Sequence, residues 1–262
     1  MTTPILSIRY TDIVLHDSQI DVLRAAIAGF AKNNIADSLA KKGLHHNLFH
    51  NHQDDGTLIE RAPLVLYHIS GAEHQPKCFS ITGIADGAKA VEILAAALPA
   101  TATIQGRQLS FQNSEKTWQH HPFQLLDGLA FYGLYHWVGF TNENYQWWLE
   151  NPLLTDRIAR GEKLIADHLA NLLKNIGSPI DRKDIKVFFE TINATERSEI
   201  AVQQGQYKRT ELCMSLSFMC NLQLPTGLGI GAYTAKGYGQ IRKLDISPER
   251  QKTLALLAKK VL

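Results

Sequence analysis

The chain has 262 residues, of which 45% are hydrophobic, so it can bury a core in one large domain or two small ones. Its formal net charge of +2 is too small to indicate nucleic-acid binding by itself. The three cysteines form no CxxC pair, which favours a reducing compartment, and we expect a cytoplasmic protein. No run of about 18 apolar residues occurs, so we expect no membrane association.

The first 120 residues predict the order strand, helix, strand, strand, helix, strand. The segments that carry this prediction are, in the same order, residues 5–15, 18–33, 62–70, 78–84, 85–99 and 107–118. Ser18 is the expected N-cap of the first helix. This element order is the split βαβ of a ferredoxin-like (RRM-like) domain.

The second half of the chain repeats part of this order after a connector expected at residues 119–128. A strand, an amphipathic helix and three further strands are expected at residues 129–140, 155–176, 185–192, 207–224 and 238–244. We therefore predict an α+β fold of two tandem ferredoxin-like domains, residues 1–120 and 121–262, the second with a degenerate second helix. A short C-terminal helix is expected after Ser247 and Pro248, with Leu254, Leu257 and Val261 facing inward.

A glycine-rich stretch at residues 224–241 is too dense in glycine for an ordinary hairpin. Its glycines are Gly227, Gly229, Gly231, Gly237 and Gly239. This spacing lets successive backbone N–H groups point into one concavity, as in an anion-binding nest. Neither the Walker GK[ST] nor GxGxxG is present, so no nucleoside triphosphate site is expected. Both a bend between two strands and a phosphate contact aided by Lys236 and Arg242 stay open.

Three segments resemble patterns of one protein family, in the family's own order. Residues 218–241 resemble a C-terminal glycine-rich motif, residues 48–69 an LFHNH segment followed by a YPLIQYK-like strand, and residues 135–148 a WLALNxxNYxxY-like segment. The family is the RAMP superfamily of CRISPR-associated proteins, and within it the endoribonucleases that process repeat RNA.

The resemblance implies a metal-independent endoribonuclease without a cofactor that cuts precursor CRISPR RNA within its repeats. In-line attack by a ribose 2′-OH would leave a 2′,3′-cyclic phosphate and a 5′-OH. The implied partner is CRISPR repeat RNA, and whether other CRISPR-associated proteins or a second copy of the chain are also partners stays open. The alternative is a non-catalytic RNA-binding subunit of an effector complex.

The resemblance also places the site residues. It assigns proton transfer to His50 and His52, with His46 as the reserve, and RNA binding to the glycine-rich loop. Lys208 and Arg209, at the start of the strand before the loop, are further candidates for phosphate contacts.

The chain departs from the family pattern at two places where RNA phosphates would be held. Ala232 stands where a lysine is expected in the glycine-rich motif, and the strand at residues 62–68 lacks the expected glutamine and lysine. We expect His68 to replace that lysine only when it is protonated.

Three interpretations of the histidine-rich stretch at residues 44–53 stay open. Imidazole suits acid/base work at neutral pH, and His50 and His52 share a side in extended backbone, whereas His46 and His50 share one in a helix. The histidines could instead be loop residues bonded to the local backbone. Half a zinc site at His46 and His50 with Asp54 and Asp55 is the third interpretation, although neither HExxH nor CxxC accompanies it.

Overall fold

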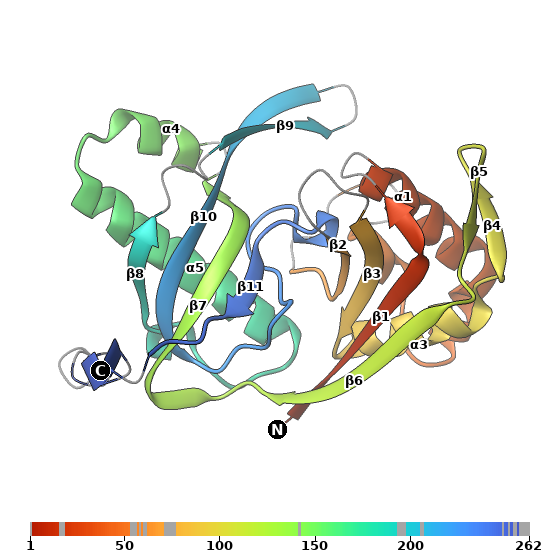
Figure 1. The fold of residues 1–262 in the computed structure, drawn as a ribbon, viewed down its shortest axis with the longest axis horizontal. Coiled ribbons are helices and arrows are strands. Elements are labelled where there is room, and N and C mark those ends of the chain that lie inside the picture. Colours follow the sequence, from red (N-terminus) through yellow and green to blue (C-terminus); the bar gives the residue numbers. More distant parts are fainter. Residues whose placement is uncertain are drawn as a thin grey trace. The chain divides into compact units, whose positions relative to one another are not determined.

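The computed structural model describes residues 2–15, 19–52, 57, 59, 62–70, 77–140, 143–192, 198–204, 207–247, 249–250, 252–253 and 256. The chain divides into two compact units (Figure 1). The N-terminal unit comprises Thr2–His121 with Ala235–Gly237, and the C-terminal unit comprises Pro122–Thr234 with Tyr238–Leu262. Among the described helices, none has both the length and the hydropathy needed to cross a bilayer.

The N-terminal unit is a four-stranded antiparallel sheet with helices. Its elements are β1 (Thr2–Leu15), α1 (Ile20–Phe30), a π-helical turn (Ala31–Ile35), α2 (Ala36–Ala40), a 3-10 turn (His46–Phe49), β2 (Val65–Ser70), β3 (Lys77–Ile84), α3 (Asp86–Ala97), β4 (Thr101–Ile104), β5 (Arg107–Ser110) and β6 (Ser114–Pro122). The strand order is β2-β3-β1-β6. The predicted order of strand, helix, strand, strand, helix, strand is confirmed, with β4 and β5 added before the last strand.

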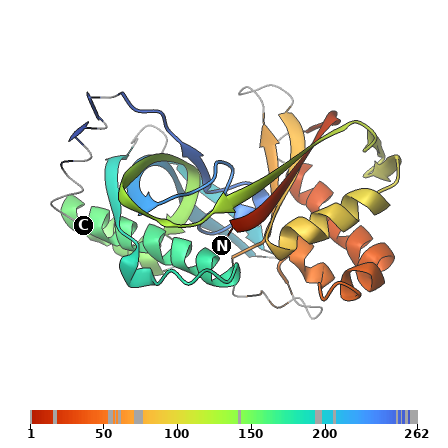
Figure 2. The same cartoon turned by 90° about the horizontal axis from the view of Figure 1, so that it is seen from below.

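The core of this unit lies between the sheet and its helices. Leu6, Ile8 and Tyr10 alternate along β1 with more exposed residues, so one face of the strand is apolar. Helices α1 and α3 cover that face, as Figure 2 shows from below, and bury Leu23 and Leu94 among their apolar residues. The histidine-rich stretch follows α2 in this unit.

Two expectations at the end of this unit were wrong. Residues 107–110 belong to a separate two-stranded sheet, in which β5 pairs with β4, and not to the last strand of the main sheet. The expected connector at residues 119–128 is largely strand, because β6 runs to Pro122 and the next strand begins at Leu125.

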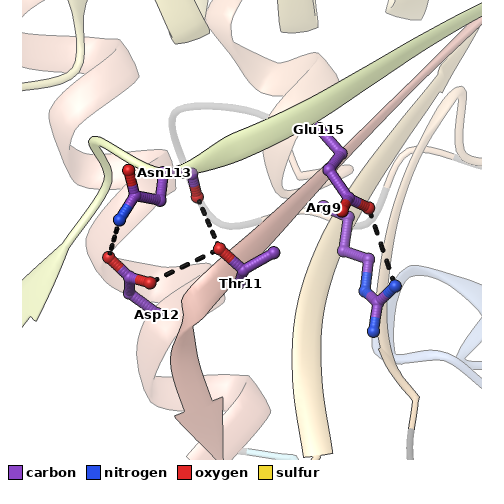
Figure 3. A network of polar contacts seen from close by, with 5 residues as sticks. All are labelled: Arg9, Thr11, Asp12, Asn113 and Glu115. Atoms are coloured by element: carbon purple, nitrogen blue, oxygen red, sulfur yellow. Dashed lines mark hydrogen bonds and ion pairs between the residues drawn. The ribbon is translucent and has the colours of Figure 1, made fainter.

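A network of polar side chains joins β1 to the start of β6 (Figure 3). The Asn113 Nδ2 donates to Asp12 Oδ2 at 2.7 Å, and the Thr11 hydroxyl lies 3.4 Å from the Asn113 carbonyl oxygen. The Thr11 amide also donates to this carbonyl, at 3.2 Å. The Arg9 Nη1 lies 3.6 Å from Glu115 Oε2. Because the Arg9 and Glu115 side chains are about half exposed, water screens their pairing and it contributes little to stability. The shorter Asn113–Asp12 bond is the contact that fixes the start of β6.

The C-terminal unit is a five-stranded sheet with one long helix. Its elements are β7 (Leu125–Phe140), α4 (Glu143–Glu150), α5 (Leu154–Asn175), a 3-10 turn (Arg182–Asp184), β8 (Val187–Ile192), β9 (Ser198–Gln204), β10 (Tyr207–Leu222), a 3-10 turn (Thr234–Lys236, of which Ala235 and Lys236 group with the N-terminal unit) and β11 (Gln240–Lys243). The order is β11-β7-β10-β8, with β9 on β10. Numbered along each unit, the four main strands follow the same order in both sheets.

Helix α5 packs its apolar stripe on one face of this sheet (Figure 2). Trp137 and Phe140 of β7 are fully buried there, and Gly161 of α5 leaves room for the Phe189 ring, which an added Cβ would meet at 2.5 Å. The prediction of a long amphipathic helix is therefore confirmed. The expected C-terminal helix positions Leu254, Leu257 and Val261 lie outside the described residues.

Candidate functional site

The histidine-rich stretch folds into a 3-10 turn followed by a bend, and its imidazoles form a series. The His45 Nδ1 caps the turn by accepting the Asn47 N–H at 3.2 Å. Ring centroids lie 4.2 Å apart between His45 and His46, 5.9 Å between His46 and His50, and 6.0 Å between His50 and His52. The fold thus brings all three predicted histidines together, whereas a uniform helix or strand would have paired only two of them.

Local hydrogen bonds fix which ring nitrogen of His50 and His52 carries a proton. The His52 N–H donates to His50 Nδ1 at 3.2 Å, so neutral His50 carries its proton on Nε2. The His52 Nδ1 lies 2.6 Å from the His50 carbonyl oxygen, which can only accept, so Nδ1 is the protonated nitrogen. Neutral His52 therefore presents a lone pair at Nε2, while His50 presents an N–H there.

Two side chains from other elements hold the backbone of this stretch. The Arg24 Nη2, from α1, donates to the His50 carbonyl at 2.8 Å, and the Tyr67 hydroxyl, from β2, donates to the Phe49 carbonyl at 2.9 Å. Asn51 adopts a left-handed φ of +54°, and its Nδ2 donates to the Ile59 carbonyl at 3.1 Å. Asn tolerates this conformation better than most residues, which lets the chain reverse between His50 and His52.

Sequence reasoning did not identify Arg24 or Tyr67. They lie 26 and 18 residues from the residues they hold, and one is a lone arginine in a helix while the other sits in an apolar strand. No local motif marks such contacts. A buried tyrosine hydroxyl usually finds a hydrogen-bond partner, and this is the signal that could have marked Tyr67.

Burial sets the charge of two groups beside the histidine-rich stretch. Burial raises the pKa of Tyr67 well above its usual range, so its hydroxyl stays a donor. His68 is 8% exposed, and burial lowers its pKa to about 4, so it is neutral at pH 7. The condition for His68 to replace the missing lysine, protonation of its ring, is therefore not met at neutral pH.

The zinc interpretation finds no geometric support within the described residues. There, no group of three His, Cys, Asp or Glu side chains is placed to hold a metal ion. Asp54 and Asp55, its expected additional ligands, lie outside the described residues.

The glycine-rich stretch is a bend whose amides are largely used within the protein. The N–H of Gly227 donates to the Ile241 carbonyl at 2.8 Å, and that of Gly239 to the His136 carbonyl at 3.1 Å. The prediction of an anion-binding nest is therefore wrong for these two amides, because both already donate to carbonyls of the protein. The N–H groups of Ile230 and Ala232 also donate to backbone carbonyls.

Most of these glycines are required by backbone conformation. Gly227, Gly231, Gly237 and Gly239 have φ values between +67° and +97°, whereas Gly229 forms an isolated bridge with Gln240. At Gly239, an added Cβ would lie 1.9 Å from the Ile230 carbonyl oxygen. The stretch therefore packs against its own backbone to form a rigid loop.

The predicted cations differ in how far their charge is already neutralised. The Lys236 Nζ lies 2.9 Å from Asp21 Oδ2, both in the N-terminal unit. Arg242 is exposed on β11, with its Cζ 4.7 Å from the Tyr135 ring centroid. Lys208 and Arg209 lie on β10 opposite Gln203 and Val202 of β9.

Comparison with known proteins gives a family match for the second half of the chain. Residues 124–244 match the family model of the Cas6b C-terminal domain. A sequence search of curated proteins gives no match.

Three solved structures are similar to the chain over most of its length. A crystal structure of Cas6b aligns with 93% of this chain and 100% of its own, at 19% identity and a TM-score of 0.71. A CRISPR RNA processing endoribonuclease Cas6b aligns with the same shares at 20% identity and a TM-score of 0.58. Csf5, a type IV Cas6 crRNA endonuclease, aligns with 94% of this chain and 100% of its own, at 11% identity and a TM-score of 0.56.

These structural likenesses show a shared fold, and the family model matches residues 124–244. Together they confirm the resemblance to CRISPR repeat-processing proteins that the sequence motifs indicated.

Proposed function

Because residues 124–244 match the Cas6b C-terminal domain, we propose that the chain is a metal-independent endoribonuclease that cuts precursor CRISPR RNA within its repeats. We interpret both units as ferredoxin-like, on the strength of their common strand order. The observation that carries the proposal is the series of His46, His50 and His52 rings, in which backbone contacts give two histidines different tautomers.

The proposed reaction needs one proton acceptor and one donor. The 2′-oxygen of a ribose forms a bond to the adjacent phosphorus, its proton passes to a base, and the bond from phosphorus to the 5′-oxygen breaks. The leaving oxygen takes a proton, so the products are a 2′,3′-cyclic phosphate and a 5′-OH. Charge on the pentacoordinate phosphate must be stabilised by hydrogen-bond donors.

His52 suits the base. Its Nδ1–H bond to the His50 carbonyl leaves Nε2 as the acceptor, and this bond persists when Nε2 gains a proton. His50 suits a hydrogen bond from Nε2–H to the pentacoordinate phosphate. Water supplies the proton that the leaving 5′-oxygen takes, because neutral His50 would become an imidazolate if it gave up Nε2–H. His46, which is 8% exposed and whose ring is tilted by 42° against that of His50 at 5.9 Å, is assigned the role of positioning the His50 ring.

The remaining predicted residues are proposed to hold the RNA backbone. We assign phosphate contacts to the cations Lys236, Arg242, Lys208 and Arg209, and we assign the glycine-rich loop the role of holding β11, which carries Arg242. A second copy of the chain and other CRISPR-associated proteins are the further partners proposed.

Cleavage of repeat RNA in EDTA tests the proposal. Wild-type protein is expected to cut, and His50→Ala and His52→Ala to cut at least about 10²-fold more slowly. His120→Ala, an exposed histidine on β6, is the matched control and keeps the wild-type rate. Activity abolished by EDTA contradicts the metal-independent mechanism, and wild-type rates in both variants contradict the site.

A non-catalytic RNA-binding subunit is the second candidate. It is favoured by the fact that Nδ1 of His45, His50 and His52 all bond to the local backbone, as histidines of a structural turn do. Retained binding of repeat RNA without cleavage would support this candidate.

A further inference from the structure

Tyr135 and Arg242 lie side by side on one face of the C-terminal sheet. In the antiparallel pairing of β11 with β7, Arg242 is opposite Gly133, and Gln240 is opposite Tyr135. Residues two apart on a strand share a face, and directly opposite residues share one too. The tyrosine ring and the guanidinium therefore project from adjacent strands to the same side.

Gly133 lets the Tyr135 ring lie across the sheet. A Cβ at Gly133 would be 2.8 Å from Tyr135 Cε2 and 3.1 Å from its hydroxyl oxygen, so any larger residue would displace the ring. The Arg242 Cζ lies 4.7 Å from the ring centroid, within the range of a cation–π contact. Tyr135 is half-buried and Arg242 exposed, which leaves a guanidinium over an aromatic ring at the surface.

Arg242 differs from the neighbouring cations in its charge balance. The Arg250 guanidinium lies over the ring of Phe131, which is two residues before Gly133 on β7 and so shares its face. Arg250 is ion-paired with Glu190. Lys236 is ion-paired with Asp21. For Arg242, no ion pair with a carboxylate is found in the part of the chain that the structure describes.

The position of Arg242 is fixed by the glycine-rich loop. The amide of Gly227 donates to the Ile241 carbonyl at 2.8 Å, and the Ile241 amide donates to the Leu228 carbonyl at 2.7 Å. β11 is therefore hydrogen-bonded on both sides, to β7 and to the loop. Such a pre-organised pair costs little conformational entropy when a ligand stacks on it.

An exposed guanidinium plane on a tyrosine ring suits a flat ligand that carries negative charge. Unpaired nucleotides have both properties, because their bases stack on aromatic rings and arginine planes while their phosphates attract cations. We propose that Tyr135 and Arg242 form a stacking site for one unpaired nucleobase of the bound RNA. This assignment rests on the proposed function and gives Arg242 a role beyond phosphate contact.

Fluorescence of 2-aminopurine, placed at one position at a time in repeat RNA of the host CRISPR array, tests the stacking site. Wild-type protein is expected to quench one position strongly in EDTA. Arg242→Lys keeps the charge but loses the plane, and Tyr135→Leu loses the ring. Both variants are expected to lose that quenching and to weaken Kd by about 10-fold, within the range for one stacked base.

Two comparisons separate stacking from charge. Arg242→Lys should leave the salt dependence of binding unchanged, whereas Arg242→Ala should lower its slope by about 0.7. Lys243→Ala, the next cation on β11 and on the opposite face, should keep the quenching. Wild-type quenching and affinity in Arg242→Lys, with loss only in Arg242→Ala, would reduce Arg242 to a phosphate contact and overturn the proposal.

The outcome for this site is distinguishable from that for the nuclease. Wild-type protein that binds and quenches but does not cut contradicts the nuclease and supports the stacking site. Wild-type protein that cuts while no base is quenched contradicts the stacking site alone. Absence of any binding to repeat RNA contradicts both.

Discussion

Single residues in the histidine-rich stretch owe their chemical roles to backbone contacts more than to their own type. His50 and His52 are both imidazoles, yet one Nδ1 accepts an amide and the other donates to a carbonyl. The carbonyl of His50 is the shared point, since Arg24 also donates to it at 2.8 Å. Displacement of this one carbonyl would move both rings.

Arg24→Met is expected to slow single-turnover cleavage of saturating repeat RNA by about 10-fold, because loss of the His50 contact loosens the site by a fraction of an ångström or more. Kd should change less than about twofold, since Arg24 acts through His50. Arg24→Lys should recover part of the rate, and Arg107→Met, an exposed arginine of the same unit, should keep it. Equal losses in rate and affinity would show that Arg24 binds RNA instead.

His68 predicts a loss of stability in mild acid. Its pKa is about 4 in the folded protein against an ordinary value of 6.5, so the unfolded chain binds the proton more readily. The contribution of His68 to the free energy of unfolding is fully present above pH 6.5 and falls as the pH approaches 4. From pH 7 to pH 5 the expected loss is about 2 kcal/mol.

Urea unfolding at pH 7 and pH 5, compared between wild type and His68→Leu, measures this loss. The variant lacks the titrating group. Between pH 7 and pH 5 its free energy of unfolding should therefore fall by about 2 kcal/mol less than that of the wild type. The same pH dependence in both proteins would mean that His68 is not desolvated.

The part of the site that could be predicted is the part whose residues lie close together in the sequence. His46, His50 and His52 are close in sequence, so a local pattern was enough to group them. Arg24 and Tyr67 reach the same stretch through the packing of α1 and β2, which local patterns do not encode. The low pKa of His68 likewise depends on burial, which its position in a strand did not reveal.

At the scale of elements, periodicity predicted those that are long and buried on one face. Helix α5 was expected at residues 155–176 and runs over Leu154–Asn175. The hairpin of β4 and β5 was missed because the alternation at residues 107–110 continues into β6 across Phe111–Asn113, and the sequence does not mark the break. Its four-residue strands are too short for a period to stand out.

The glycine-rich loop gives a prediction at this scale, because two of its glycines share a left-handed φ but not their surroundings. Gly227→Ala meets nothing within 4 Å and should cost about 1–2 kcal/mol of unfolding free energy for the conformation alone. Gly239→Ala also meets the Ile230 carbonyl at 1.9 Å and should cost about 1–3 kcal/mol more. Equal melting temperatures for the two variants would contradict the close packing of the loop.

For the whole molecule, the amino-acid composition did not indicate a function. The order of the three motifs indicated a CRISPR repeat-processing protein. A net charge of +2 is not that of a strongly basic nucleic-acid-binding protein, and the Asp21 carboxylate offsets one of the expected cations. The proposed function therefore depends on a few side chains with defined positions, namely His50 and His52 in the N-terminal unit and Arg242 on β11 in the C-terminal unit. Its central claim is cleavage by the 2′-OH of the RNA itself.

The most direct measurement is single-turnover cleavage, in EDTA, of repeat RNA that carries one 2′-deoxynucleotide immediately 5′ to the scissile phosphate. The account predicts that the wild-type protein binds this RNA normally and does not cut it there, while the unmodified RNA yields a 2′,3′-cyclic phosphate. Cleavage of the deoxy-substituted RNA at the same phosphate would contradict the account.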